Sequence, residues 1–138
     1  MRDNLSGGSR TTQDRLIPFC MITDPELARV AFNETEAKKR GIAYRLAKMP
    51  MAAVLRAVTL GETRGLIKML NDAESDRILG FTAFGTETSE MMAAVQTAML
   101  GRSPYTVLRD AILTHPTMAE GLVFSMASVP AKAMQQSA

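Results

Sequence analysis

Residues 65–84, GLIKMLNDAESDRILGFTAF, contain the pattern that decides the fold. Two apolar runs, 65–70 and 77–84, flank the polar segment 71–76, which is rich in Asn, Asp, Glu and Ser. Apolar runs of this length, separated by a short polar turn, are typical of a β-hairpin. The pattern therefore predicts two antiparallel strands in the middle of the chain.

Three further strands are predicted on the N-terminal side of this hairpin. Residues 19–22 and 27–32 lie on either side of Asp24-Pro25, where proline fixes φ and favours a turn. Residues 42–50 alternate, with Ile42, Tyr44 and Leu46 on the more apolar face, which is typical of a half-buried strand. Together with the hairpin, these segments predict a mostly antiparallel sheet of about five strands.

A helix is predicted between the second and third of these strands. Asn33 and Glu36 have the spacing of a capping box, and Gly41 can adopt the left-handed conformation that ends a helix. Residues 51–60 favour a helix by composition, but they lack a clear cap, and their structure stays open at this point.

The C-terminal third has helical patterns. Apolar side chains recur every three or four residues from Met91 to Met99, before Gly101. A second helix is predicted from Pro104 up to His115-Pro116, because Val107, Leu108, Ala111 and Ile112 continue the apolar face. A third is predicted from the capping box 117–120 to Ala127 or Val129. Because strands come first and helices last, the predicted fold class is α+β, with helices packed on the sheet. We interpret the methionines on these helices as core side chains; alternatively, a methionine-rich face would be a surface for a partner.

One ordered domain is predicted. Residues 1–15 are polar and contain Gly and Ser, which indicates a flexible linker or the remnant of a preceding domain. Residues 16–130 would form the domain, and residues 131–138 a frayed tail. A chain of 138 residues can bury enough surface to fold without a metal or a disulfide.

Composition excludes several classes of function. The 16 basic and 14 acidic side chains give a net charge of +2, which is too even for an electrostatic nucleic-acid binder. No apolar run approaches the roughly 20 residues of a membrane helix, so no membrane partner is expected. One cysteine and one histidine cannot build the usual zinc shells, so no metal site is expected. Cys20 is interpreted as a reduced packing residue, which favours a cytoplasmic location.

Motifs for nucleotide binding and for serine hydrolysis are absent from the sequence. No glycines form G-x-G-x-x-G, there is no G-x-x-x-x-G-K-[ST] loop, and no serine has the flanking glycines of a nucleophile elbow. The chain therefore has no self-contained dinucleotide or nucleotide site in its sequence.

The candidate functional site is centred on the single histidine of the sequence, His115. Pro116 stops a helix from continuing through His115, which places the imidazole on an irregular corner. Glu120 follows one turn into the next predicted helix, where its carboxylate could reach back to one ring nitrogen and orient a general acid–base. Alternatively, Glu120 completes the capping box with Thr117. Both can hold, because a carboxylate has two oxygens.

The run His115-Pro-Thr-Met-Ala-Glu120 resembles the C-terminal dimerisation domain of flavin-dependent pyridine nucleotide-disulfide oxidoreductases, the family of glutathione reductase, dihydrolipoamide dehydrogenase and mercuric reductase. The resemblance extends from about Leu16 to about Val129. Other segments resemble the family in the same order: residues 23–30 its first strand pair, 62–68 with 77–80 its central hairpin, and 85–90 the entry to its long helix. Residues 4–12 resemble the sequence that leads into this domain in mercuric-reductase-like members.

This resemblance implies a homodimer in which two subunits share each redox site. The flavin and a redox-active cysteine pair would belong to other domains of one subunit, and His115 and Glu120 would come from the other subunit. His115 would take up and return the proton of the redox thiols, with Glu120 as its orienting partner. The backbone of His115 and Pro116, joined by a cis bond typical of the family, would lie near the FAD in the FAD-binding domain of the partner subunit.

The resemblance also implies what this chain does not do alone. FAD and NAD(P)H would be cofactors of the full-length enzyme, none is expected on this chain, and the chain by itself is expected to be inactive. The flavin domain, the nicotinamide domain and the cysteine pair are not within these 138 residues, and the chain ends without the vicinal cysteines of mercuric reductases. Ala31 stands where a glycine is common in the family. The alternative is a stand-alone α+β protein-binding module with no redox role.

Overall fold

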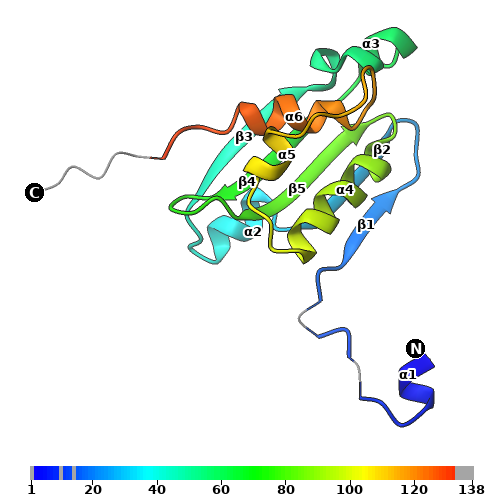
Figure 1. The fold of residues 1–138 in the computed structure, drawn as a ribbon, viewed down its shortest axis with the longest axis vertical. Coiled ribbons are helices and arrows are strands. Elements are labelled where there is room, and N and C mark those ends of the chain that lie inside the picture. Colours follow the sequence, from blue (N-terminus) through cyan, green and yellow to red (C-terminus); the bar gives the residue numbers. More distant parts are fainter. Residues whose placement is uncertain (1, 10, 14, 133–138) are drawn as a thin grey trace, which may run out of the picture.

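The structure is a computed structural model that describes residues 2–9, 11–13 and 15–132. Figure 1 shows a twisted sheet with helices packed against it. The elements follow one another as α1 (Arg2–Leu5), β1 (Pro18–Met21), β2 (Glu26–Ala31), α2 (Glu34–Lys39), β3 (Tyr44–Pro50), the 3-10 helix η1 (Met51–Ala53), α3 (Leu55–Leu60), β4 (Leu66–Asp72), β5 (Ile78–Gly85), α4 (Thr88–Leu100), α5 (Thr106–Arg109) and α6 (Glu120–Ala127).

The sheet has five strands in the order β1-β2-β5-β4-β3, and every neighbouring pair is antiparallel. The central hairpin β4–β5 pairs Lys68 with Thr82 and Met69 with Phe81, and its register shifts at Leu70/Asn71. The predicted α+β class and the predicted number of strands are both confirmed.

Helices α4 and α6 pack on one face of the sheet, where the main core lies (Figure 1). Val30, Ile67 and Phe81 point from the strands into this core and are fully buried. The interpretation of the methionines as core residues is confirmed, and Met99 is partly buried against the same core. Those buried in it are Met49, Met51, Met69, Met91, Met92, Met118 and Met126.

The opposite face carries a smaller cluster under α2, which joins Ala37 to Leu70 and Leu79. Strand β3, which the alternating pattern predicted as a half-buried strand, lies between both clusters and has packed side chains on both faces. Arg45 and Ala47 face the main core and are 8% and 1% exposed, whereas Tyr44 and Leu46 are half-buried beside α2. Both faces of β3 are covered, so alternation alone did not identify the face that packs more closely.

The predicted capping box of α2 is present. Asn33 Oδ1 accepts a hydrogen bond from the Glu36 amide at 2.8 Å, and the Glu36 carboxylate accepts one from the Asn33 amide at 3.0 Å. Gly41 has φ +63, the left-handed conformation expected at the end of the helix. Residues 51–60, left open by the sequence, form η1 and α3, and α3 ends at Gly61 with φ +72.

The helix predicted from Pro104 to His115 is wrong. Only α5, four residues long, forms there, and residues 110–119 have no helix. The apolar stripe that suggested a longer helix is not buried as a face, since Val107 is 54% exposed and Ile112 is fully exposed. A short helix needs the burial of an apolar face to be stable in water, and this segment lacks it.

The ends of the chain are partly outside the description. Helix α1 forms within residues 1–15, which the sequence predicted to be a linker, and Figure 1 shows it set apart from the sheet. Residues 133–138, most of the predicted tail 131–138, lie outside the described residues, while Lys132 Nζ lies 3.1 Å from Asp76 Oδ1. The boundaries of the domain 16–130 stay a prediction. In the described part of the chain, no helix combines the length and the apolar character needed to cross a membrane.

Candidate functional site

His115 lies on the loop that connects α5 to α6, and its peptide bond to Pro116 is cis. The His115 side chain is 61% exposed, whereas that of Glu120, the first residue of α6, is 16% exposed. In Figure 1 the loop runs to the end of the molecule that also carries α3. The imidazole of His115 is therefore exposed to solvent, whereas the Glu120 carboxylate beside it is largely buried.

The two side chains form a close pair. Both carboxylate oxygens of Glu120 lie 2.9 Å from Nδ1 of His115. Because a carboxylate only accepts, this contact places the hydrogen on Nδ1 and leaves the Nε2 lone pair of the neutral ring available. Within the described residues, Nε2 has no hydrogen-bond partner.

The start of α6 holds Glu120 in place. Thr117 Oγ1 donates to the Thr114 carbonyl at 2.8 Å and accepts from the Glu120 amide at 3.3 Å. The next residue, Gly121, is packed so closely that a Cβ there would lie 2.8 Å from Val54 Cγ2. The first turn of α6 thus packs directly against the core. This packing fixes the backbone position from which the Glu120 side chain extends.

Two roles were considered for Glu120: orienting the His115 ring and completing the capping box with Thr117. The contact required for the first role is present. Half of the predicted capping box is present, through the Thr117 hydroxyl, but the Glu120 carboxylate has no hydrogen bond back to the Thr117 amide among the described residues. A carboxylate on Nδ1 fixes the tautomer and stabilises the imidazolium that forms when Nε2 takes a proton. The arrangement can serve as a general acid–base toward a group that approaches from outside.

The other reactive side chain, Cys20, lies elsewhere. It is half-buried on β1, at the sheet edge opposite to β3, and burial, followed by the charge of Glu26, raises the pKa of its thiol. A raised pKa disfavours the reactive thiolate, which agrees with a packing role. Across the described ranges, no three His, Cys, Asp or Glu side chains lie close enough together to hold a metal.

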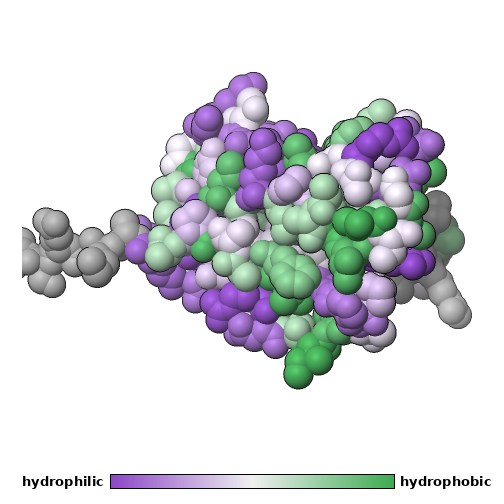
Figure 2. Space-filling view, turned by 90° about the horizontal axis from the view of Figure 1, so that it is seen from above, coloured by the Kyte–Doolittle hydropathy of each residue, from purple (hydrophilic) through white to green (hydrophobic). Residues whose placement is uncertain are grey.

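The sequence did not reveal that apolar side chains close to His115 in the chain are exposed. Ile112 is fully exposed three residues before it, and Phe124, one turn after Glu120 on α6, is 48% exposed. The sequence pattern assigned Ile112 to a buried helical face, so no local signal pointed to its exposure. Figure 2 looks onto the molecule from above and shows apolar patches separated by polar side chains on that face.

The chain belongs to the family of the pyridine nucleotide-disulphide oxidoreductase dimerisation domain, whose model matches residues 17–126. The resemblance found in the sequence is thereby confirmed.

Relatives of known name agree with this assignment. The chain is 37% identical over 124 residues to the probable pyridine nucleotide-disulfide oxidoreductase RclA of Escherichia coli, covering 88% of this chain and 28% of the relative. It is 36% identical over 118 residues to a dihydrolipoyl dehydrogenase of Thermus scotoductus, covering 86% of this chain and 26% of the relative. Both relatives are longer proteins, of which the chain spans less than a third.

A solved structure has the same fold. The HOCl-induced flavoprotein disulfide reductase RclA from Escherichia coli superposes with a TM-score of 0.87 at 36% sequence identity, covering 94% of this chain and 30% of that chain.

Proposed function

We propose that this chain is the dimerisation domain of a flavin-dependent disulfide oxidoreductase and supplies the His115–Glu120 pair to the redox site of the other subunit. The observation that carries the proposal is the geometry of the pair: both oxygens of an enclosed carboxylate contact Nδ1 of an imidazole that is 61% exposed. A histidine used only for packing or capping would not need its free nitrogen turned outward.

In this proposal His115 Nε2 takes up and returns the proton of the redox thiols, because the thiolate is the species that attacks a disulfide. Glu120 keeps the hydrogen on Nδ1 and stabilises the charged ring. The flavin, bound in the other domains of the partner subunit, would supply two-electron transfer between NAD(P)H and the disulfide. In this chain, the exposed backbone of His115 and Pro116 would face the flavin. The chain alone would have no reductase activity.

Exposed apolar side chains around the pair support a partner surface. Ile112 and Phe124 flank the pair along the chain, and α5, which carries Val107 at 54% exposure, contacts α6. Apolar groups grouped at a surface are commonly buried in an interface. We propose that they pack against the FAD-binding domain of a second subunit in a homodimer. A cytoplasmic location, drawn from the lone Cys20, stays a prediction.

A mixed-dimer experiment tests the proposal. Residues 16–130 would replace the corresponding domain of Escherichia coli RclA, to which the chain is 37% identical. His115→Ala should lower NAD(P)H-dependent disulfide turnover by about 100-fold or more, the scale of a lost general acid–base. Dimers that combine a His115→Ala subunit with a subunit lacking its redox cysteines should regain turnover, because one complete site then forms across the interface.

Two results would overturn the proposal. One is a His115→Ala chimera with unchanged turnover. The other is the absence of recovery in mixed dimers whose formation has been verified. Arg56→Gln on α3, which removes a charge outside the site, serves as the control and should leave turnover unchanged. In the isolated chain, 15N shifts of its single imidazole should show Nδ1 protonated, and this preference should be lost in Glu120→Ala.

A further inference from the structure

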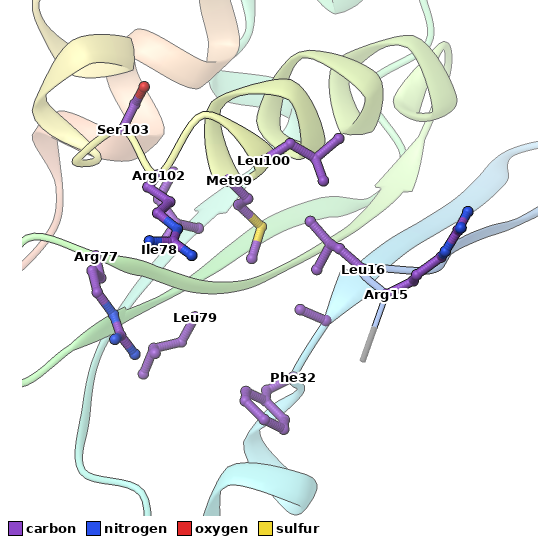
Figure 3. Close-up of a pocket in the computed structure, with 11 residues that line it drawn as sticks. Arg15, Leu16, Phe32, Arg77, Ile78, Leu79, Met99, Leu100, Arg102 and Ser103 are labelled. Carbon is purple, nitrogen blue, oxygen red and sulfur yellow. The ribbon is translucent and has the colours of Figure 1, made fainter. Parts of the chain in front are cut away.

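A cavity of about 1240 Å³ opens on the side of the molecule where the N-terminal segment reaches the sheet. Its walls come from four separate parts of the chain: residues 15–16, the end of β2 with Phe32, the start of β5 with Arg77, and the end of α4 with the residues that follow it (Figure 3). None of its lining residues belongs to α6 or to the loop that carries His115. The cavity is therefore independent of the site discussed above.

Three arginines surround this cavity: Arg15, Arg77 and Arg102. Their side chains are exposed, and within the described part of the chain none of them forms an ion pair or a side-chain hydrogen bond. Among the residues that the structure describes, no aspartate or glutamate lines the cavity. Asp72 is near enough to Arg77 for their charges to interact, but its carboxylate accepts hydrogen bonds from the amides of Glu74 and Ser75.

The floor of the cavity is apolar. Phe32, Leu79 and Met99 contribute to it, and Figure 3 shows Arg77 and Arg102 on one side of the lining, with Arg15 on the other side and its side chain directed away from them. An apolar surface favours a ring or hydrocarbon body, whereas guanidinium groups match the planar geometry of carboxylate and phosphate oxygens. Three like charges around one cavity also repel one another, and an anion placed between them removes that repulsion.

We propose that this cavity binds a small organic anion, with an apolar body on the floor formed by Phe32, Leu79 and Met99 and a phosphate or carboxylate held by Arg77 and Arg102. Ligand sites combine an apolar lining with a few convergent polar groups, and this cavity has both. Arg15 closes the side formed by the N-terminal segment.

Arg102 offers a second, separate argument. It lies just beyond Gly101 at the end of α4, with φ +53, a conformation in which glycine is less strained than any side chain. If the Arg102 side chain contributed to stability, its loss in Arg102→Gly would lower the melting temperature despite the relief of backbone strain. If it serves binding, Arg102→Gly should weaken binding without lowering the melting temperature, so this variant separates the two roles.

The experiment uses the 138-residue chain with methyl-labelled methionine and three probes: 2-naphthyl phosphate, inorganic phosphate and 2-naphthol. We expect 2-naphthyl phosphate to shift the methyl signal of Met99 but not that of Met126, which is buried in the main core. It should bind at least about tenfold more tightly than phosphate or 2-naphthol, since only it engages both the arginines and the floor. A parallel titration with 2-naphthoate shows which anionic group the arginines prefer, and binding of either anion supports the proposal.

Substitutions inside and outside the cavity test whether the probe binds there. Arg77→Gln and Arg102→Gly should each weaken binding about tenfold, the scale of one lost hydrogen bond to a charged group. Arg102→Gly should leave the melting temperature unchanged or raise it. Arg56→Gln, on α3 and outside the cavity, should leave binding unchanged. The proposal is overturned if neither aromatic anion binds, if 2-naphthol binds equally well, or if Arg56→Gln weakens binding as much as the cavity variants do.

Discussion

At the scale of single residues, Ala31 is one of three described non-glycine residues with a left-handed backbone, together with Glu87 and Arg102. It ends β2 with φ +58, in the left-handed region that disfavours any residue with a Cβ. The two flanking contacts fix this conformation: the Arg29 guanidinium donates to the Ala31 carbonyl, and the Phe32 amide donates to the Leu79 carbonyl at 3.2 Å. The chain cannot rotate away from the strain without losing both.

Ala31→Gly should therefore raise the free energy of unfolding by about 0.5–1 kcal/mol, because relief of the left-handed strain exceeds the added entropy of the unfolded glycine. Urea denaturation at neutral pH measures this change. Ala28→Gly, a fully buried position in the same strand, is the matched control and should lower the free energy of unfolding. A lower stability of Ala31→Gly would show that its Cβ contributes packing that outweighs the strain.

The burial of Arg45 could not be predicted from its residue type. An arginine in an alternating strand suggests an exposed side chain, yet Arg45 is 8% exposed. Its guanidinium donates to the carbonyls of Asp72, Ser75 and Pro130, which belong to distant parts of the chain, and lies 5.5 Å from the Tyr105 ring centre. Burial of a charge depends on partners that only the folded chain brings together.

At the scale of secondary-structure elements, local chemistry separates the helices that could be predicted from those that could not. The signals of α2 lie within nine residues, Asn33 to Gly41, and each forms the contact expected of it. The hairpin β4–β5 was equally readable, because its two runs and its turn are contiguous. The predicted length of helix α5 was wrong. The length depends on whether a neighbouring surface covers the apolar side chains of residues 107–112, and the spacing of residues in the sequence does not show this.

The capping contact of α2 predicts a dependence of stability on pH. The hydrogen bond from Arg29, and next the one from the Asn33 amide, lower the pKa of Glu36 below its ordinary value of 4.5. The folded state thus favours the carboxylate. Its contribution to stability is complete above about pH 4.5 and is lost as the pH falls through the lower pKa of the folded state.

The variant Glu36→Gln tests this directly. Its free energy of unfolding should lie below that of the unchanged chain at pH 7, and the difference should be smaller at a second, acidic pH below 4.5. Glu90→Gln, at an exposed position of α4 with no side-chain hydrogen bond among the described residues, is the control and should show a small difference at both pH values. A difference for Glu36→Gln that stays constant with pH would assign the effect to packing instead of charge.

At the scale of the whole molecule, the two candidate sites differ in how far apart their residues lie in the sequence. His115 and Glu120 are separated by one turn of loop and helix, so their contact was predicted from spacing, and the structure has it at 2.9 Å. The cavity arginines, Arg15, Arg77 and Arg102, come from segments that only the sheet and α4 bring together. No local pattern connects them, so the cavity could not be predicted from the sequence.

The surface around His115 provides a last prediction, which concerns assembly. If the exposed side chain of Ile112 is buried against a second subunit, a charge there must be desolvated on assembly without an opposite charge to compensate it. In the chimeric dimer, Ile112→Glu should raise the dissociation constant at least about tenfold, the scale of one unpaired polar group in an interface. Sedimentation over a range of concentrations measures it.

Ile22 supplies a matched comparison, because it is also a largely exposed isoleucine, at 78%, but lies beyond the end of β1, far along the chain from the His115 loop. Ile22→Glu makes the same chemical change and should leave the dissociation constant within about twofold, the usual range for a neutral surface substitution. Equal weakening by both variants would mean that added negative charge alone opposes assembly. Weakening by Ile112→Glu alone would place this loop in the contact between subunits, the position from which His115 must reach the thiols of its partner.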